Sequence, residues 1–393
     1  MNNINMKADA VYVHIPFCRQ KCLYCDFASY AGYTAEAMES YVGALCEEIA
    51  LRKEEAQAVS SGATVYFGGG TPSVLPAGSI ERIVAALRGA GFWREPREAT
   101  IEVNPGTADL GKLQALRAMG FDRISFGVQS LKDDELRAIG RIHSAQQALE
   151  AVALAEAAGF ARVSCDLIYG LPGQSMASLQ DTLKRLLGTG IEHISVYGLI
   201  VEEGTPLQRL VDAGKLVLPD EDVAADMYEL VQRVLREAGF TRYEISNYAR
   251  NNQYSRHNRV YWQYRPYVAF GAAACGFDGS VRRTAVDNVE AYISGIQAWR
   301  LDGAATGLYT IEELSEGEQL SEYMFMGLRQ TDGADLAEAR RRFGVDVWNM
   351  YKTQLRKFAG SGLLIYDEKA AKLRLTEKGM ELGNLIFEIF VSN

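Results

Sequence analysis

Continuous apolar runs alternate with longer amphipathic segments along the first 240 residues or so of the chain. The runs do not alternate between apolar and polar positions, which is typical of strands buried on both faces. We expect six such strands, at 11–15, 64–67, 100–103, 123–128, 162–168 and 193–199. The pattern between and after them predicts helices near 35–57, 79–89, 109–119, 145–158, 176–188 and 221–238.

Glycines support this order of elements. Gly120, Gly159 and Gly239 each follow a predicted helix, where a glycine can take the left-handed conformation that ends it. Repeated strand–helix units imply a parallel sheet with right-handed crossovers. Six units fit either a partial barrel or a doubly wound open sheet, and the pattern alone leaves both open.

The pattern changes after residue 240. Residues 241–310 are polar and rich in tyrosine, and from about residue 311 a helical pattern returns. Two short apolar runs at 363–366 and 373–376 flank a charged turn, which predicts a β-ribbon before a last helix, as in winged-helix modules. We therefore expect a core domain over 1–240, a linking segment over 241–310 and a winged-helix-like domain over 311–393.

Charge argues against nucleic acid as the main partner. The 393 residues include 41 Lys and Arg against 50 Asp and Glu, a formal net charge of −9. The stretch 340–378 is locally basic, with ten Lys and Arg and four Asp and Glu. We interpret it as a solvated face of a small domain and expect no specific nucleic acid, with duplex DNA binding as the alternative.

The cysteines are distributed unevenly. The opening residues MNNINMKADA lack the apolar run of a secretory signal, and no stretch reaches the roughly 18 apolar residues of a membrane span, so we expect a cytosolic protein. A reducing compartment does not favour a disulfide framework. Three of the six cysteines, Cys18, Cys22 and Cys25, fall within eight residues.

These three cysteines directly follow the first predicted strand, at the end of the sheet where α/β folds place their sites. Structural zinc usually takes four ligands in spaced pairs, and the chain has no second such pair; His14 is a conceivable fourth ligand, but it lies within the predicted strand. Free reactive thiols are a weaker alternative. Three cysteines on one loop better suit an iron–sulfur cluster whose fourth iron stays open.

Other strand ends carry glycines and polar side chains. The second strand ends in Gly68-Gly69-Gly70-Thr71-Pro72, where backbone N–H groups can approach a ligand closely. Glu102 lies at the end of the third strand, Gln129 follows the fourth, and Asp166 lies within the fifth. Any one of them alone is more simply a structural polar group, but several at one end of a sheet predict a shared pocket.

The cysteine loop and the glycine turn together resemble the radical S-adenosylmethionine (SAM) superfamily. The longer match, from Tyr12 to Cys18 and from Asp166 to Pro172, is similar to its oxygen-independent coproporphyrinogen III oxidase-like branch. This resemblance implies a partial (β/α)6 barrel. It also implies a [4Fe-4S] cluster on the three cysteines and SAM contacts from Tyr12, Gly69, Gly70, Thr71, Glu102, Gln129, Arg141 and Asp166. By sequence alone Arg141 is equally a solvated helix-end residue.

Two departures separate the chain from the oxidases of that branch. The oxidases carry a fourth cysteine two residues after the third, and here that position is Phe27. The chain also starts only 11 residues before Tyr12, whereas the oxidases have a long N-terminal segment over their active site. Both departures count against porphyrinogen decarboxylation and resemble instead the HemW subgroup of heme chaperones.

Residues 257–262 read HNRVYW and resemble the HNxxYW signature of those chaperones. An imidazole beside aromatic rings can ligate heme iron while the rings pack on the porphyrin. The resemblance therefore implies heme as a third cofactor with His257 as its ligand, and Cys275 is a second candidate; without the resemblance, a lone histidine in an aromatic-rich loop is more often structural.

The resemblance implies a heme chaperone that passes heme to apo-hemoproteins, respiratory ones near the membrane. Peripheral membrane association, a homodimer and SAM cleavage stay open at this stage. The alternatives are a radical SAM oxidase of coproporphyrinogen III and a DNA-binding regulator that senses through its cluster.

Overall fold

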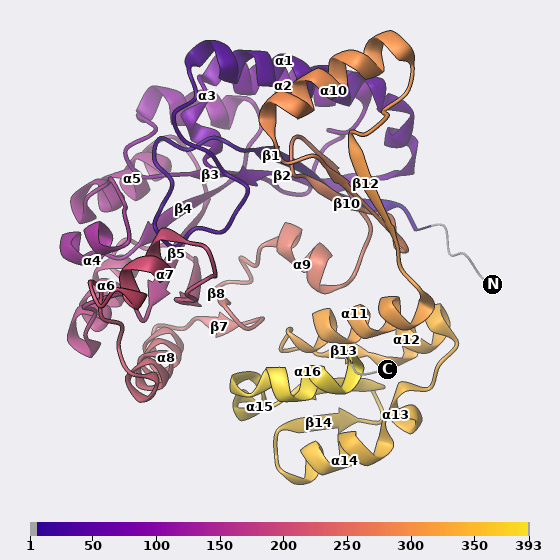
Figure 1. The fold of residues 1–393 in the computed structure, drawn as a ribbon. Helices are drawn as coiled ribbons and strands as arrows, with labels where there is room; N and C mark the ends of the chain where they lie inside the picture. The colour runs from indigo at the N-terminus through magenta and orange to yellow at the C-terminus, as the bar shows by residue number, and fades with distance from the viewer. Residues whose placement is uncertain (1–5, 392–393) are drawn as a thin grey trace.

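The computed structural model describes residues 6–391 and centres on one large sheet (Figure 1). Six parallel strands form its middle and are neighbours in chain order: β1 (Ala8–Ile15), β2 (Val59–Gly69), β3 (Ala99–Val103), β4 (Arg123–Gln129), β5 (Arg162–Tyr169) and β6 (His193–Gly198). All six predicted strands are present, and β2 begins at Val59 rather than Thr64. Their carboxyl ends therefore meet along one edge of the sheet.

Helices follow the strands and cover the outer face of the sheet (Figure 1). They are α1 (Ala35–Leu51), α2 (Ala77–Ala90), α3 (Leu110–Ala118), α4 (Asp133–Ala138), α5 (Ala145–Ala157), α6 (Met176–Leu187), α7 (Pro206–Asp212) and α8 (Glu221–Glu237). The predicted helix at 35–57 is wrong over its last six residues, because α1 stops at Leu51 and the chain continues as a 3-10 helix, η1 (Lys53–Ala58). Gly120, Gly159 and Gly239 take φ values of 101°, 87° and 80°, which confirms their helix-ending role.

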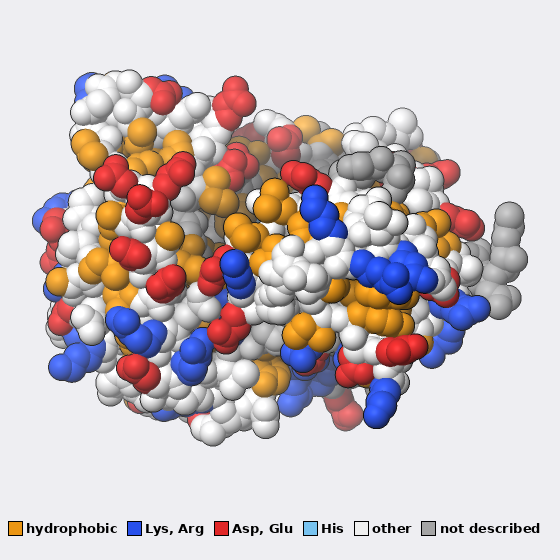
Figure 2. Space-filling view, turned by 90° about the horizontal axis from the view of Figure 1, so that it is seen from below, with side chains coloured by type: hydrophobic (Ala, Val, Ile, Leu, Met, Phe, Trp, Pro, Cys, Tyr) orange, Lys and Arg blue, Asp and Glu red, His pale blue; other side chains and the backbone are white. Residues whose placement is uncertain are grey.

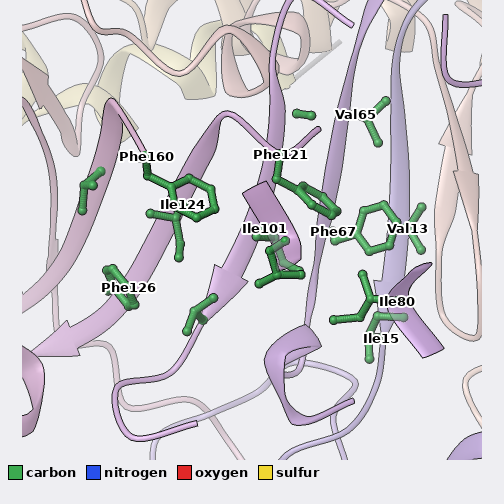
Figure 3. Close-up of a cluster of buried hydrophobic side chains, with 14 of the residues drawn as sticks. Val13, Ile15, Val65, Phe67, Ile80, Ile101, Phe121, Ile124, Phe126 and Phe160 are labelled. Carbon is green, nitrogen blue, oxygen red and sulfur yellow. The ribbon is translucent and has the colours of Figure 1, made fainter. Parts of the chain in front are cut away.

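A continuous apolar core fixes these elements against one another. Figure 3 shows side chains of neighbouring strands meeting those of the covering helices and loops, and Phe67 and Phe121 pack edge to face with ring centroids 5.1 Å apart. Burial of each large apolar side chain contributes about 1.5–3 kcal/mol. The core sets the strand register and so the relative positions of the polar strand ends.

Residues 241–310 extend the sheet at both sides. β8 (Asn247–Ala249) pairs antiparallel with β6 and carries β7 (Thr241–Arg242), while β9 (Tyr267–Phe270) pairs parallel with β1. β10 (Cys275–Phe277), β11 (Val281–Ala285) and β12 (Tyr309–Glu313) continue beyond β9, and α10 (Val289–Asp302) packs on α1. The sequence pattern predicts none of these strands, because each is only two to five residues long. The predicted boundaries at 240 and 310 stay predictions.

The helix α9 (Arg256–Trp262) carries the HNxxYW segment and lies on the face of the sheet opposite α1 and α2 (Figure 1). It contacts β1 and β2 on one side and α11 of the C-terminal domain on the other. α9 therefore stands between the parallel sheet and the C-terminal domain.

The C-terminal domain has a separate apolar core and a small antiparallel sheet. Its helices are α11 (Glu316–Leu328), α12 (Leu336–Phe343), α13 (Val347–Met350), α14 (Lys352–Gly360), α15 (Glu377–Glu381) and α16 (Gly383–Val391). β14 (Leu364–Asp367) pairs with β15 (Lys372–Leu375), with β13 (Ala334–Asp335) at the other edge of β15. The predicted β-ribbon before a last helix is thus confirmed.

On the face seen from below in Figure 2, Lys and Arg side chains are scattered among Asp and Glu side chains, as on an ordinary solvated surface. No helix in the described range 6–391 has the length and apolar character needed to cross a membrane. The first five residues of the opening segment, where the sequence predicts no secretory signal, lie outside the described residues.

Candidate cofactor-binding site

A cleft of about 450 Å³ opens at the carboxyl ends of the central strands. This volume lies within the range of small-molecule sites. Ten of the predicted site residues line it: Cys18, Cys22, Cys25, Gly69, Gly70, Thr71, Glu102, Gln129, Arg141 and Asp166. Tyr12 and His257 are not among its lining residues. The strand ends that the sequence analysis grouped together thus share one cavity.

The cysteine loop is tied to the end of β1. Cys18 N donates to Tyr30 O at 2.9 Å, and Tyr30 N donates to Pro16 O at 2.7 Å, which closes the loop between them. All six cysteines are free thiols, and Cys18, Cys22 and Cys25 are half-buried. The Cys18 Sγ lies 3.4 Å from Thr71 Oγ1, so the loop also contacts the glycine turn.

The arrangement of the thiols can be compared with what different metal groups need. Among the described residues, no three His, Cys, Asp or Glu side chains converge closely enough to hold one metal ion. A four-iron cluster needs three thiols spread around a rim instead, because each sulfur binds a different iron. Three half-buried thiols on one loop beside one cleft fit that second requirement.

The glycine turn lies against the start of the cysteine loop. Gly70 N donates to Ile15 O at 2.9 Å and Thr71 N donates to Phe17 O at 2.8 Å. A Cβ at Gly70 would lie 2.8–2.9 Å from backbone atoms of Phe17 and Ile15, and Gly69 has a φ of 105°. Both glycines are therefore required by the backbone itself. Close approach of a ligand to this turn stays a prediction.

Two carboxyl groups form part of the lining. Glu102 Oε1 accepts a 2.6 Å hydrogen bond from the Tyr66 hydroxyl, and burial raises the pKa of Glu102 to about 7. Burial also raises the pKa of Asp166, whose carboxylate lies 3.4 Å from Ser125 Oγ. Near neutral pH the cleft therefore offers one carboxyl group that gains or loses a proton easily.

Gln129 lies at an irregularity of β4. The register of β4 with β5 shifts between Gly127 and Gln129, and Gln129 has a φ of 65°, in the left-handed region that non-glycine residues rarely adopt. Bulges of this kind are frequent beside functional sites, where they redirect a side chain. The bulge ends the parallel pairing and leaves Gln129 on the cleft wall.

Arg141 lies inside the cleft, so its interpretation as a solvated helix-end residue is wrong. Its Nη2 donates to Asn104 Oδ1 at 2.8 Å and to Gly127 O at 2.5 Å, and its Nη1 donates to Cys22 Sγ at 3.4 Å. Its Nε is buried without a hydrogen-bond partner among the described residues. One guanidinium thus joins the cysteine loop to the ends of β3 and β4 and keeps an unused donor.

His257 lies behind the cleft, at the start of α9, and is only 1% exposed. Its Nδ1 is 2.8 Å from Thr64 Oγ1, and its Nε2 is 2.8 Å from the Tyr261 hydroxyl. Burial lowers the pKa of His257 to about 3, so the imidazole is neutral. Both ring nitrogens are engaged, and ligation of heme iron by His257 requires one of these contacts to break.

The N-terminus of α9 is held by Glu98. Its carboxylate accepts hydrogen bonds from Arg256 N and His257 N, both at 2.9 Å, and forms a 2.8 Å ion pair with Arg162. An anion at a helix N-terminus satisfies the free N–H groups of the first turn. The HNxxYW helix is therefore anchored to the sheet at its first turn.

Sequence reasoning missed Tyr66, Asn104 and Tyr24, which also line the cleft. The position of Tyr66 could have been predicted from the sequence, because Thr64 and Tyr66 are two residues apart on a strand and side chains at that spacing lie on the same face. That face is the one on which His257 lies. Tyr12 also lies there, with its ring stacked on Tyr66 at a centroid distance of 6.2 Å.

Comparison with known proteins agrees with the motifs. Residues 12–186 match the radical SAM superfamily, and residues 314–382 match the HemN C-terminal domain. A protein of Lactococcus lactis named heme chaperone HemW is 34% identical over 386 residues, which cover 98% of both chains. A Bacillus subtilis protein of the same name is 34% identical over 383 residues, covering 97% of this chain and 99% of the relative.

Two further comparisons extend the picture. A mitochondrial Danio rerio protein named radical S-adenosyl methionine domain-containing protein 1 is 38% identical over 390 residues, covering 95% of this chain and 84% of that one. The solved structure of the radical SAM enzyme HemN from Escherichia coli, a coproporphyrinogen III oxidase, superposes with a TM-score of 0.83 at 22% identity, over 99% of this chain and 91% of that chain. This likeness confirms the predicted α/β fold with its C-terminal helical domain.

Proposed function

The chain belongs to the radical SAM superfamily and, within it, to the HemW heme chaperones, and on that premise we propose that it binds heme and transfers it to apo-hemoproteins. The observation that carries the proposal is the identity of about one third over nearly the full length of relatives that bear this name. Likeness of that extent covers the cleft, α9 and the C-terminal domain together.

The cleft holds the other two cofactors of this proposal. Cys18, Cys22 and Cys25 bind a [4Fe-4S] cluster, which when bound supplies one-electron chemistry to SAM. SAM occupies the cavity beside the cysteine loop, against the glycine turn and the polar strand ends. Arg141 supports this assignment, because it donates to Cys22 Sγ and keeps its buried Nε free.

The fold is compatible with the oxidase alternative, but the chain lacks the fourth cysteine of the oxidases. Phe27 stands where the oxidases carry their fourth cysteine, and its ring is 71% exposed at the cleft. A phenyl ring cannot supply the thiol chemistry of a cysteine. The Lactococcus lactis and Bacillus subtilis relatives, similar over nearly the full length, carry the chaperone name, whereas the oxidase structure is 22% identical.

The recipients, the location and the oligomeric state are further proposals that rest on the family resemblance of the sequence. We propose that the chain delivers heme to respiratory apo-hemoproteins, acts from the cytosol and associates peripherally with the membrane where those recipients lie. We also propose a homodimer as the working form. Separation of cell fractions and chromatography of the holo-protein test these points independently of heme transfer.

The function is tested by two assays on one anaerobic preparation with a reconstituted cluster. A Soret titration is expected to show saturable heme binding. A parallel assay with coproporphyrinogen III, SAM and dithionite is expected to form no more protoporphyrinogen IX than the Cys22→Ala control. Absence of heme binding, or product above that control, would overturn the proposed function.

A further inference from the structure

A second cavity, of about 320 Å³, lies between α9 and the C-terminal domain. Arg259 and Trp262 line it from α9, and further lining residues come from α11, α12 and β15. His257 is on a different face of the same helix, toward β2. The HNxxYW helix thus separates a buried histidine from a cavity at a domain boundary, where ligand sites are frequent.

Basic side chains outnumber acidic side chains in the lining of this cavity. Its acidic residues are Asp332, Asp335 and Glu338, and its basic residues are Arg259, Arg265, Arg342 and Lys372. Each carboxylate is already engaged, since Asp332 pairs with Arg259 at 3.6 Å, Asp335 caps α12 and Glu338 pairs with Arg341.

Arg342 and Lys372 form no ion pair among the described residues, although Asp335 and Asp367 stand opposite Lys372 in the small sheet. Arg265 lies 3.8 Å from Asp9. Arg342 is held in place, because its guanidinium stacks on Tyr264 and Tyr323 at 5.2 and 5.4 Å and Nη1 donates to Tyr264 O. Glu338, one turn earlier on α12, acts on Arg342 only from beyond ion-pair distance, so this partly buried, immobilised cation can receive a further anion.

Aromatic side chains also form part of the cavity wall. Trp262 and Tyr323 add aromatic surface to the lining. Two cations without an ion pair and two aromatic rings suit an anionic ligand that bears carboxylates on a flat apolar body.

We propose that this cavity binds the propionate carboxylates of heme, with Arg342 and Lys372 as the charged donors. The inference rests on the proposed function and names the part of heme that the C-terminal domain recognises. The cavity volume lies at the lower end of ligand sites, so it takes the carboxylate edge and leaves the rest of the macrocycle outside.

The test compares hemin with hemin dimethyl ester, in which both carboxylates are blocked, by Soret titration of the full-length reconstituted protein. Wild-type protein is expected to bind the ester at least about tenfold more weakly. Arg342→Gln and Lys372→Gln are each expected to raise the Kd for hemin about tenfold and to bring the two ligands closer together. Arg340→Gln and Lys369→Gln, exposed cations outside the cavity on α12 and beside β15, are matched controls expected to change nothing.

The outcomes separate the two claims. If wild-type protein binds no hemin, the proposed function fails and the inference fails with it. If wild-type protein binds hemin and its ester equally and Lys372→Gln stays within twofold, the inference is overturned and the function stands. Arg342→Lys keeps the charge and is expected to retain more affinity than Arg342→Gln, which separates lost charge from a folding defect seen by circular dichroism.

Discussion

Tyr66 stacks on His257 with ring centroids 4.8 Å apart, and the hydroxyl of the same tyrosine binds Glu102 in the cleft. One side chain of β2 therefore contacts both the proposed SAM site and the HNxxYW helix. Thr64, two residues earlier on the same face, holds the other side of the imidazole through Nδ1. A movement of α9 cannot leave the Glu102 carboxyl undisturbed.

The Tyr66 hydroxyl is expected to stabilise the fold measurably. Tyr66→Phe keeps the ring on His257 but removes the 2.6 Å hydrogen bond to Glu102. Loss of a partner for a buried carboxyl should lower the free energy of unfolding by about 1–3 kcal/mol. Urea unfolding followed by circular dichroism measures this, and a loss below a few tenths of a kcal/mol would show that the contact contributes nothing.

The contribution of Glu102 to the stability of the SAM-free protein should fall as pH rises. The pKa of Glu102 is raised by burial from 4.5 to about 7, so between these values the folded state holds a proton that the unfolded chain has released. This contribution to the free energy of unfolding decreases with pH across the window, by up to about 3 kcal/mol, and is constant above it. Burial lowers the pKa of the four histidines, whose contributions change with the opposite sign over part of the same window, so the Glu102 contribution is measured as the difference between wild type and variant.

Glu102→Gln should remove that contribution, because an amide does not titrate, so the stability of the variant relative to wild type should rise with pH across the window. The exposed Glu81 of α2 offers a control, and Glu81→Gln should leave the contribution in place. Chemical unfolding at a series of pH values from about 5 to 8 checks both variants. An unchanged pH dependence of stability in Glu102→Gln would assign it to another group, with Asp166 the next candidate.

Tyr261 should restrain His257. Tyr261→Phe removes the hydroxyl 2.8 Å from His257 Nε2 and leaves the imidazole in place. If His257 is the heme ligand, the freed nitrogen should bind iron more readily, and heme affinity should rise up to about fivefold for a hydrogen bond of about 1 kcal/mol.

His257→Ala alone is a weaker test of the heme ligand. It removes a buried ring with two hydrogen bonds, so it should also cost about 2–4 kcal/mol of stability. Soret titrations of both variants decide the question. Unchanged affinity in both, with the fold intact, would remove His257 as the ligand and direct attention to Cys275.

The cluster assignment predicts a sharp contrast among cysteines. Cys18→Ala, Cys22→Ala and Cys25→Ala should each lose bound iron and sulfide after reconstitution, because each removes one thiolate of three. Cys46→Ala is the matched control, since Cys46 is half-buried in α1 away from the cleft. Iron and sulfide analysis measures the effect, and full cluster content in any of the first three would contradict the ligand set.

The features that could be predicted from the sequence are those that depend on residues close together in the chain. The six central strands are readable because burial on both faces makes them continuous apolar runs, and the cysteine loop because its ligands lie within eight residues. The surroundings of His257 are not readable in this way. Its partners Thr64 and Glu98 are 193 and 159 residues away in the chain, and only the fold brings them together.

The strands at both sides of the sheet show the same limit. β7, β8 and β10 are two or three residues long, so no periodic pattern can form within them. Arg141 was ambiguous for a related reason, since the Asn104 amide and the Cys22 thiol that hold it come from two distant loops. The local sequence pattern predicts local structure, whereas polar contacts between distant residues arise only once the chain is folded.

Transfer of heme to a recipient tests the central claim most directly. The heme-loaded protein is mixed with an apo-cytochrome in the presence of excess apoglobin, which captures any heme released into solution, and the cytochrome spectrum is followed in time. A chaperone is predicted to fill the cytochrome despite the scavenger and faster than free hemin does. If the heme reaches only the apoglobin, or fills the cytochrome no faster than free hemin, the protein binds heme without delivering it and the account is contradicted.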